Sequence, residues 1–365
     1  MVRSEKKHRI IFIDLMRAFA VIQMVQGHTV DTLLAPEFRS EQYPVYFIWN
    51  FMRGMTAPIF MFTAGTVFTY LFRLVDEPFK NNPRVKKGFF RFLLLVSIGY
   101  LLRYPTYTIF DFSNVTQDRW DVFFAVDVLQ LIGFGILFVM AAAYLAEKLK
   151  IGDTIVFTLF SVFFFFATPF FSKIDWIAFL PQAIAGYFYP DTGSLFPLFP
   201  WAGYVVLGGV LGSYLAKNPL VFKTNKFSLN LALFGFGLIL ASEASVFITG
   251  KYFGYYIEHT SYTPDTIVLR VGFVLVLNSL VSFISQKIES IPRIIILVGR
   301  NTLLIYVVHL MILYGSAWNP GLSFLWGSSL QISETVISAL IMIILMIFMV
   351  LLLSKLKFRN KQLVT

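Results

Sequence analysis

The chain has 365 residues, of which 57% are hydrophobic, 18% aromatic and only 14% charged, a composition that excludes an ordinary soluble protein and indicates a membrane protein. Its net charge of +10 does not indicate a nucleic-acid-binding protein, because the Lys and Arg residues lie between apolar stretches and in short tails. The absence of cysteine excludes disulfides, thiolate metal ligands and a cysteine nucleophile, and no metal is expected.

Apolar stretches of about 20 residues, the length that crosses a bilayer as a helix, recur along the whole chain. They predict an all-α fold, a polytopic bundle of about ten transmembrane helices that forms a single domain over residues 1–365. The predicted spans are 10–33, 45–72, 88–103, 123–146, 154–171, 197–216, 227–249, 266–286, 293–315 and 333–354.

The basic residues predict the orientation of this bundle. Most of the 30 Lys and Arg residues fall in every second connecting segment and in the two tails, 1–9 and 355–365. Since cytoplasmic segments of membrane proteins are enriched in Lys and Arg, both tails are expected in the cytoplasm and the protein in the cytoplasmic (inner) membrane. Two tails on one side require an even number of spans, which favours ten over nine or eleven.

Three segments have structural interpretations. Residues 157–171 include no ionisable side chain, which predicts a lipid-facing helix. Gly208 and Gly212 form a pair of small residues one turn apart, which predicts close packing of two helices. The proline-broken loop 173–200 is too short to cross the membrane, so it is expected to lie along the interface, where it could cover a site.

The first span carries ionisable residues at membrane depth, where they are costly and occur next to a partner or a wet cavity. Arg17 and His28 are eleven residues apart, about three helical turns, and therefore share one face of the helix. Asp14 lies about 40° around the helix from His28 and about one turn before Arg17. This spacing permits either a local Asp14–Arg17 ion pair or a contact of both residues with a substrate.

His28 is the central catalytic candidate, as a general base or as an acyl carrier, and Asp31 follows it by three residues. The alternative is a histidine that is simply hydrogen-bonded to a backbone carbonyl near the interface.

Other spans contain further charges. Arg53 and Asp127 are expected to line a polar cavity rather than to form a lone ion pair, and His309 either contacts substrate or caps a buried network. Glu243 and Arg270 are opposite charges at similar depth in consecutive helices, so they are expected to neutralise each other.

The segment RIIFIDLMRAFAVIQMVQGH at 9–28 resembles the opening helix of the transmembrane acyltransferase superfamily in the spacing of its Asp, Arg and His. Four later blocks follow the order seen in bacterial relatives of the heparan-alpha-glucosaminide N-acetyltransferase catalytic domain. The first and last of the five blocks also resemble the acyltransferase-3 family. The later blocks are APIFMFTAGTVFTYLFR at 57–73, DVLQLIGFGILF at 127–138, FPLFPWAGYVVLGGVLG at 196–212 and LVGRNTLLIYVVHL at 297–310.

This resemblance implies an enzyme that transfers an acyl group, typically acetyl, from cytoplasmic acetyl-CoA to a sugar, glycan or glycolipid on the other side of the membrane. His28 matches the catalytic histidine position of the family. One departure is Ala18 in place of a common Gly, a small residue that should still allow close helix packing. The other is the pair Arg84 and Arg91, which are more widely spaced than in relatives. The expected substrate-binding residues are Asp14, Arg17, Arg53, Gln130, Arg300, Asn301 and His309.

The donor phosphates are expected at the cytoplasmic mouth. Lys86, Lys87, Arg91 and Arg300 are the candidate contacts, although orientation signalling explains Lys86 and Lys87 better when each is considered by itself. The thin arm of the donor would then run along the Arg17 face of the first helix.

His28 would take the proton of the acceptor hydroxyl or amine, with Asp127 or Asp31 orienting its ring. Direct transfer and an acetyl-histidine intermediate both remain open, as does a homo-oligomeric state. Two other functions also remain open: a secondary transporter or flippase that uses the same polar path, and a scaffold or sensor without activity.

Overall fold

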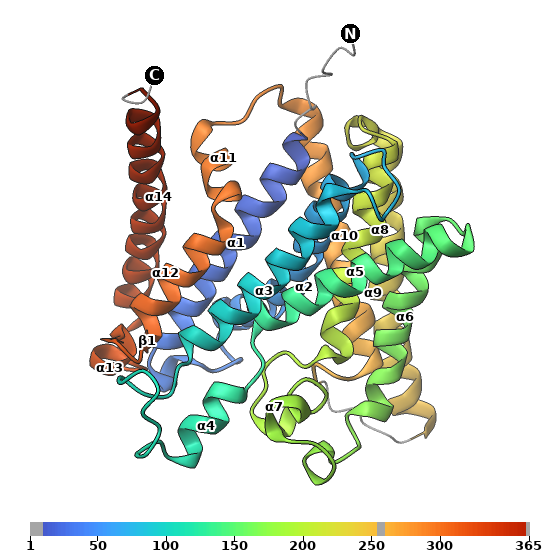
Figure 1. The fold of residues 1–365 in the computed structure, drawn as a ribbon. Coiled ribbons are helices and arrows are strands. Elements are labelled where there is room, and N and C mark those ends of the chain that lie inside the picture. Colours follow the sequence, from blue (N-terminus) through green and yellow to red (C-terminus); the bar gives the residue numbers. More distant parts are fainter. Residues whose placement is uncertain (1–9, 254–259, 363–365) are drawn as a thin grey trace. The chain divides into compact units, whose positions relative to one another are not determined.

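The computed structural model describes residues 10–253 and 260–362, with side chains for 10–252 and 260–356 (Figure 1). The predicted tail 1–9 and the side chains beyond Leu356 in the predicted tail 355–365 lie outside this description. The described chain forms two compact units. The middle unit comprises Met61–Lys287, and the terminal unit comprises Ile10–Phe60 together with the residues from Ile288 onward.

In the terminal unit, α1 packs against α11, α12 and α14. The start of α1 and the end of α14 lie at the same end of this unit, as two tails on one side of a membrane require (Figure 1). Its elements are α1 (Ile11–Leu33), η1 (Pro36–Phe38), the first half of α2 (Pro44–Arg73), α11 (Arg293–Arg300), α12 (Thr302–Tyr314), β1 (Gly315–Ser316), β2 (Asn319–Pro320), α13 (Leu322–Trp326) and α14 (Ile332–Gln362).

Hydrogen bonds stabilise the C-terminal end of α1. The last carbonyl groups of a helix lack partners within the helix, and cationic side chains near them are favourable. The Arg39 guanidinium supplies that charge, because its Nη2 donates to the Asp31 carbonyl oxygen at 2.8 Å. The backbone N–H groups of Ser328 and Leu330 donate to the carbonyl oxygens of Thr32 and Leu33 at 2.8 and 2.9 Å.

In the middle unit, α3 packs on α5, α8 lies against α5 and α6, and α9 pairs with α10. Its elements are the second half of α2, α3 (Pro83–Leu102), α4 (Gln117–Phe124), α5 (Val128–Leu149), α6 (Asp153–Phe171), η2 (Trp176–Ala178), α7 (Gln182–Ala185), η3 (Pro190–Thr192), α8 (Leu198–Lys217), η4 (Val221–Lys223), α9 (Asn225–Phe253) and α10 (Pro264–Lys287).

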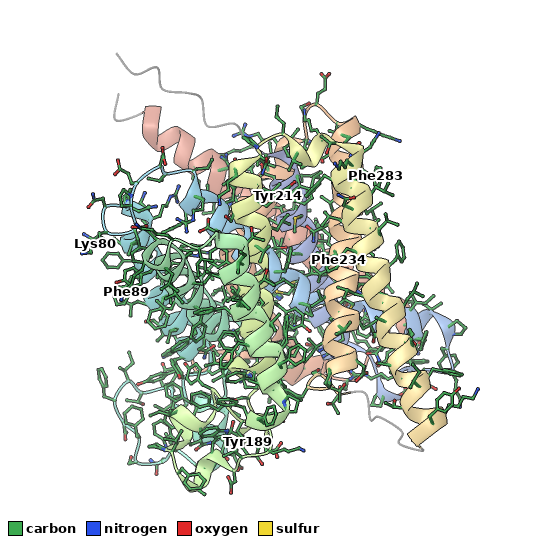
Figure 2. All side chains as sticks on the ribbon, turned by 90° about the vertical axis from the view of Figure 1, so that its right-hand side faces the viewer. Lys80, Phe89, Tyr189, Tyr214, Phe234 and Phe283 are labelled. Carbon is green, nitrogen blue, oxygen red and sulfur yellow. The ribbon has the colours of Figure 1, made fainter. Side chains whose placement is uncertain are left out.

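The packing of α8 and the exposure of α6 confirm two predictions. A Cβ at Gly208 would lie 2.0 Å from the Phe62 carbonyl oxygen, so α2 and α8 approach as closely as their backbones allow. On α6, the Phe166 and Phe170 side chains are 75% and 73% exposed, as expected of a lipid-facing helix. Apolar side chains also cover α3 and α10, where Phe89 and Phe283 project outward (Figure 2).

Before α8 begins at Leu198, the loop 173–200 contains only the short elements η2, α7 and η3, and each of them is too short to cross a membrane, as predicted. The Gln182 side chain of α7 donates to Asp121 Oδ1 of α4 at 2.8 Å, and Gln117 donates to the same oxygen at 2.8 Å. Helices α4 and α7 lie at one end of the middle unit (Figure 1).

Seven helices of the described chain are long and apolar enough to cross a membrane, or eight when α11 and α12 count as one bent span. Helices α1 and α3, with 23 and 20 residues, are also long enough to cross a membrane. They are not among the seven because their polar and basic residues make them less apolar. The fold is therefore an all-α polytopic bundle, as predicted. The number of ten spans and the cytoplasmic location of the tails stay predictions.

The span predicted at 293–315 is not one helix. It is broken between α11 and α12, whose axes differ in direction by 75°. The break lies at Asn301, where φ is −107° and ψ is 27°, and the Asn301 side chain donates to the Leu297 carbonyl oxygen at 2.7 Å. Such a side-chain bond competes with the helical ladder, so the prediction of a continuous helix is wrong for a local reason.

Candidate active site

Helix α12 brings two side chains to His28 of α1 within the terminal unit. The Nδ1 atom of His28 lies 3.3 Å from the Tyr314 hydroxyl oxygen, and the centres of the two rings are 6.0 Å apart, edge to face. The centres of the His28 and His309 rings are 5.5 Å apart, with the rings tilted by 46°. The imidazole of His28 therefore lies next to a second imidazole and a phenol.

The tautomer of His309 follows from its hydrogen bond. Its side chain is fully buried, and Nδ1 lies 2.8 Å from the Ile305 carbonyl oxygen. A carbonyl only accepts, so Nδ1 must carry a proton. In the neutral ring Nε2 then carries a lone pair, and this atom has no hydrogen-bond partner among the described residues. His309 thus offers a buried acceptor beside His28.

Asp31 and Arg53 form an ion pair at the same end of α1. Arg53 Nε donates to Asp31 Oδ2 at 2.5 Å, and the side chains are 49% and 25% exposed, respectively. The sequence predicts that Asp31 or Asp127 orients the His28 ring, and this role stays a prediction. In the structure the Tyr314 hydroxyl lies at Nδ1 of His28, and the Asp31 carboxylate accepts from Arg53. We call His28, Asp31, Arg53, His309 and Tyr314 the His28 layer.

A second polar layer lies nearer the start of α1, where Gly299 of α11 touches the helix. A Cβ at Gly299 would lie 2.9 Å from the Asp14 carbonyl oxygen and 3.4 Å from Arg17 Cβ. Asp14 is buried and Arg17 is half-buried, while Ala18 is buried at 4% exposure in this crossing. The close packing predicted at Ala18 is confirmed.

Arg300 and Asn301 follow directly at the bend, and Arg300 is exposed. We call Asp14, Arg17, Gly299, Arg300 and Asn301 the Arg17 layer. Arg17 and His28 are eleven residues apart on one helix, so about 16 Å separates the two layers along α1.

The predicted residues Asp127 and Gln130 lie in the middle unit, where they cap α5. The Asp127 side chain accepts from the Val128 N–H at 2.7 Å, and Gln130 completes a capping box. The other carboxylate oxygen accepts from Arg103 Nη2 at 2.8 Å. This geometry gives both residues a structural role, and their predicted catalytic and substrate roles stay predictions.

The predicted phosphate contacts Lys86, Lys87 and Arg91 are exposed on α3, and Lys86 Nζ lies 5.8 Å from the centre of the Phe90 ring. Among the described residues, no three His, Asp or Glu side chains meet as metal ligands.

Glu243 and Arg270 do not neutralise each other. The Arg270 guanidinium donates to Ser261 Oγ at 3.1 Å and lies over the Trp201 ring at 5.2 Å, whereas Glu243 is exposed on α9. The prediction was wrong because similar depth in consecutive helices does not fix the directions in which side chains point.

Sequence reasoning also missed an ion-pair cluster in the middle unit. Asp153 at the start of α6 accepts from Arg73 Nη2 at 2.7 Å and from Ser213 Oγ at 2.8 Å, and Lys217 Nζ lies 3.5 Å away. Each of these four residues lies at or near the end of a predicted span. Charged residues at such positions were interpreted only as signals of membrane orientation. Tyr314 was missed because an aromatic residue at the end of a helix is typical of the membrane–water interface and does not by itself indicate a catalytic site.

The family model of the heparan-alpha-glucosaminide N-acetyltransferase catalytic domain matches residues 9–248. The match contains Asp14, Arg17 and His28 and ends within α9, before His309 and Tyr314. No curated protein matches the sequence. The match covers about two thirds of the chain. The protein therefore belongs to the heparan-alpha-glucosaminide N-acetyltransferase catalytic-domain family.

Proposed function

We propose that this membrane acetyltransferase takes the acetyl group of cytoplasmic acetyl-CoA and transfers it to an amino or hydroxyl group of a sugar presented on the other side of the membrane. The observation that carries the proposal is the His28 imidazole, which lies 3.3 Å from the Tyr314 hydroxyl and next to the His309 ring, on the same helix as Arg17. The name of the matching family supports a glucosaminide as acceptor.

His28 acts as the general base. When its Nδ1–H donates to the Tyr314 oxygen, Nε2 carries the lone pair that accepts the proton of the acceptor amine or hydroxyl. The acceptor atom forms a bond to the acetyl carbonyl carbon, and the bond from that carbon to the CoA sulfur breaks. His28 then gives its proton to the departing thiolate, so the imidazole returns to its neutral form.

The neighbours of His28 prepare this step. The free lone pair of His309 Nε2 stabilises the His28 imidazolium or holds the acceptor. The Arg53–Asp31 pair is half-exposed, and it can therefore bind a polar substituent of the acceptor without burial of a charge. Asp127 remains a second candidate for orienting the imidazole.

The Arg17 layer binds the donor. Arg300 is exposed at the bend between α11 and α12, where a guanidinium suits the bidentate recognition of a phosphate. Lys86, Lys87 and Arg91 are further candidates for that contact. The distance of about 16 Å between Arg17 and His28 suits a donor whose phosphates lie in one layer and whose thioester reaches the other.

The test uses the purified protein in lipid nanodiscs with radiolabelled acetyl-CoA and glucosamine. We expect acetylglucosamine from the unchanged protein and a loss of about 10²-fold to 10⁴-fold in His28→Gln, the range typical of a general base. Gln26→Asn, on another face of α1, is the matched control and should keep the activity. Full activity in His28→Gln would refute the role of His28, and label retained on the protein after donor alone would replace direct transfer by an acetyl-histidine.

One observation favours a second function. The broken span at Asn301 is typical of transporters, in which interrupted helices bind substrates at the membrane midplane. Coenzyme A separates the two functions, because a ligand that binds the folded state raises the unfolding temperature. An acetyltransferase should be stabilised by CoA, whereas a transporter of an unrelated substrate should not.

A further inference from the structure

The C-terminal end of α12 is bonded to the chain that follows it. Helix α12 ends at Tyr314, and the chain then turns back as the β1–β2 hairpin, in which Ser316 pairs with Asn319. The Met311 carbonyl oxygen in the last turn of α12 accepts two hydrogen bonds, one from the Gly315 N–H and one from Asn319 Nδ2 at 2.9 Å. The Asn319 side chain therefore closes the helical turn that carries Tyr314.

The amide of Asn319 is fixed by further contacts within the hairpin. Its Oδ1 accepts from Ser316 Oγ at 2.5 Å, and its Nδ2 also donates to the Pro320 carbonyl oxygen at 3.2 Å. A Cβ at Gly315 would lie 2.6 Å from the Asn319 carbonyl oxygen, so the returning strand runs directly against the end of α12. Both polar atoms of the Asn319 side chain are thus bonded within the chain, which favours a structural contact over a contact with substrate.

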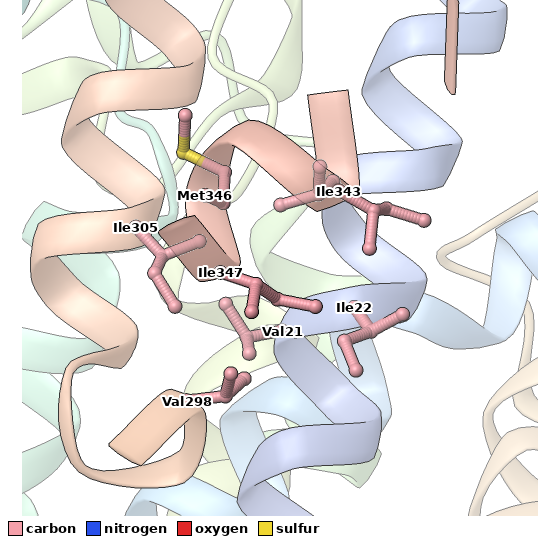
Figure 3. A pocket seen from close by; sticks show the side chains of 8 residues that line it. Val21, Ile22, Val298, Ile305, Ile343, Met346 and Ile347 are labelled. Carbon is pink, nitrogen blue, oxygen red and sulfur yellow. The ribbon is translucent and has the colours of Figure 1, made fainter. Parts of the chain in front are cut away.

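Apolar packing fixes the body of α12 and one side of its last turn. Ile305 of α12, Val21 of α1 and Val298 of α11 line one small space that is surrounded by aliphatic and thioether side chains alone (Figure 3). Ile305 precedes Tyr314 by nine residues, about 13 to 14 Å along the helix. Leu313 is fully buried, but Tyr314 is 49% exposed. Because an exposed side chain gains little from packing, the direction of Tyr314 depends on the backbone of the last turn.

The contact between Tyr314 and His28 tolerates little displacement. The Tyr314 hydroxyl oxygen lies 3.3 Å from His28 Nδ1, at the long end of the range for a hydrogen bond, so an outward shift of a few tenths of an ångström breaks it. On the other side of the contact, the Ser328 N–H donates to the Thr32 carbonyl oxygen, one turn after His28. The connection 315–331 between α12 and α14 is therefore bonded to the helix ends on both sides of the contact.

From these contacts we infer that Asn319 is a positioning residue for acetyl transfer, because it keeps the Tyr314 hydroxyl at Nδ1 of His28. The inference rests on the proposed function and deepens it, and Asn319 lies beyond residues 9–248, which the family model matches. When the Tyr314 contact is lost, the tautomer with the proton on Nδ1 and the lone pair on Nε2 loses its partner. His28 then accepts the acceptor's proton less often, while binding of both substrates is unchanged.

The first experiment compares acetyl transfer by Asn319→Ala and Asn218→Ala in nanodiscs. Asn218 is the matched control, because its Nδ2 donates to the Tyr214 carbonyl oxygen at 3.1 Å at the C-terminal end of α8, in the middle unit. In Asn319→Ala we expect kcat to fall about threefold to tenfold, as for the loss of one hydrogen bond, with both KM values within about twofold. Asn218→Ala should keep kcat. An unchanged kcat in folded Asn319→Ala, or a changed KM at constant kcat, would overturn the inference.

A double-mutant cycle tests whether Asn319 acts through Tyr314. In Tyr314→Phe the hydroxyl is already absent, so adding Asn319→Ala should lower kcat less than about twofold further. If the two losses multiply instead, Asn319 affects the reaction by another route and the inference is wrong. Thermal unfolding checks that each variant folds. If Asn319→Ala does not fold, Ser316→Ala removes the bond to Asn319 Oδ1 and must show the same loss of kcat, suppressed in Tyr314→Phe.

The second experiment does not depend on activity. The chain has four histidines, and nitrogen NMR of labelled histidine reports the hydrogen bonding of the ring nitrogens, with His28 assigned from the signal lost in His28→Gln. The Nδ1 resonance of His28 should move in Tyr314→Phe, move in the same direction in Asn319→Ala and stay in Asn218→Ala.

This pattern supports the positioning role even if no acetyl transfer is found, in which case only the proposed function fails. An Nδ1 resonance that does not move in Asn319→Ala would overturn the inference, and acetyl transfer that depends on His28 would then leave the proposed function standing alone.

Discussion

Gly299 of α11 lies so close to Asp14 of α1 that a methyl group at position 299 would be 2.9 Å from the Asp14 carbonyl oxygen. Real Cβ atoms essentially never approach that closely, so a side chain at this position must push the two helices apart. The crossing therefore fixes the backbone positions of the Arg17 layer on α1 and α11.

The Gly299→Ala variant should therefore be destabilised, by about 1–3 kcal/mol, as is typical of overpacking. Its unfolding temperature in detergent should fall, and the stabilisation by CoA should weaken. Gly54→Ala is the control, because a Cβ at Gly54 in α2 meets nothing within 4 Å, and alanine favours a helix by about 0.5–1 kcal/mol over glycine. A Gly299→Ala protein as stable as Gly54→Ala would contradict the crossing.

Removal of the Tyr314 hydroxyl tests how His28 is oriented. Tyr314→Phe keeps the ring and loses the contact at 3.3 Å from His28 Nδ1. We expect kcat to fall about tenfold, at the cost of one net hydrogen bond of about 1–1.5 kcal/mol, with an unchanged KM for the donor. Tyr43→Phe is the control, because Tyr43 is 55% exposed. A change in KM with constant kcat would show that Tyr314 binds substrate instead.

His309→Asn separates the two nitrogens of the buried imidazole. The Asn amide can still donate to the Ile305 carbonyl oxygen in place of Nδ1, but nothing replaces the lone pair of Nε2. Acetyl transfer should fall at least tenfold while the unfolding temperature stays within a few degrees. If stability collapsed and the residual activity per folded molecule were normal, His309 would be a packing residue.

Asp127 is tested by the difference between two substitutions. Asn caps helices about as well as Asp, whereas replacement by Ala typically costs 0.5–2 kcal/mol. If capping of α5 is its main role, Asp127→Asn keeps most of the activity and Asp127→Ala loses stability. If both variants lose transfer activity at normal stability, Asp127 contributes to the chemistry, as the sequence suggested.

The Asp153 cluster should contribute strongly to stability. Asp153 is 8% exposed, and removal of one partner of a buried ion pair costs about 3–5 kcal/mol. Asp153→Asn should therefore lower the unfolding temperature sharply. Lys217→Met should change it little, since the Lys217 side chain is 59% exposed and 3.5 Å from the carboxylate. Similar effects of both substitutions would contradict this ranking.

The helices and the polar face of α1 were predictable from sequence because they depend on local pattern. The apolar run at 10–33 became α1 at Ile11–Leu33, and the small residue Ala18 lies at a close crossing as expected. The break at Asn301 was not predictable from hydropathy, which does not indicate where a helix bends; at this position the Asn301 side chain donates to the Leu297 carbonyl oxygen.

The composition of the His28 layer was the least predictable feature. His28 and Tyr314 are separated by 286 positions, and nothing in either segment encodes their meeting. Asp31 pairs with Arg53, and Asp127 pairs with Arg103. In each case the packing of the helices places that arginine next to the carboxylate. The sequence pointed to Asp31, Arg53 and Asp127, but it did not point to Arg103 and did not identify either pairing.

The crossing of α1 with α11 and α12 also has a consequence for biosynthesis. The helices that cover Asp14 and His28 follow α1 by about 260 residues, so at ~5–20 residues per second they emerge roughly 13–50 s later. During that interval α1 enters the membrane or stays beside it with its polar face uncovered, and its composition falls below that of the seven apolar helices. The helix that carries the proposed chemistry is thus translated long before the helices that pack on it, and its stable insertion should depend on synthesis of the chain through α12.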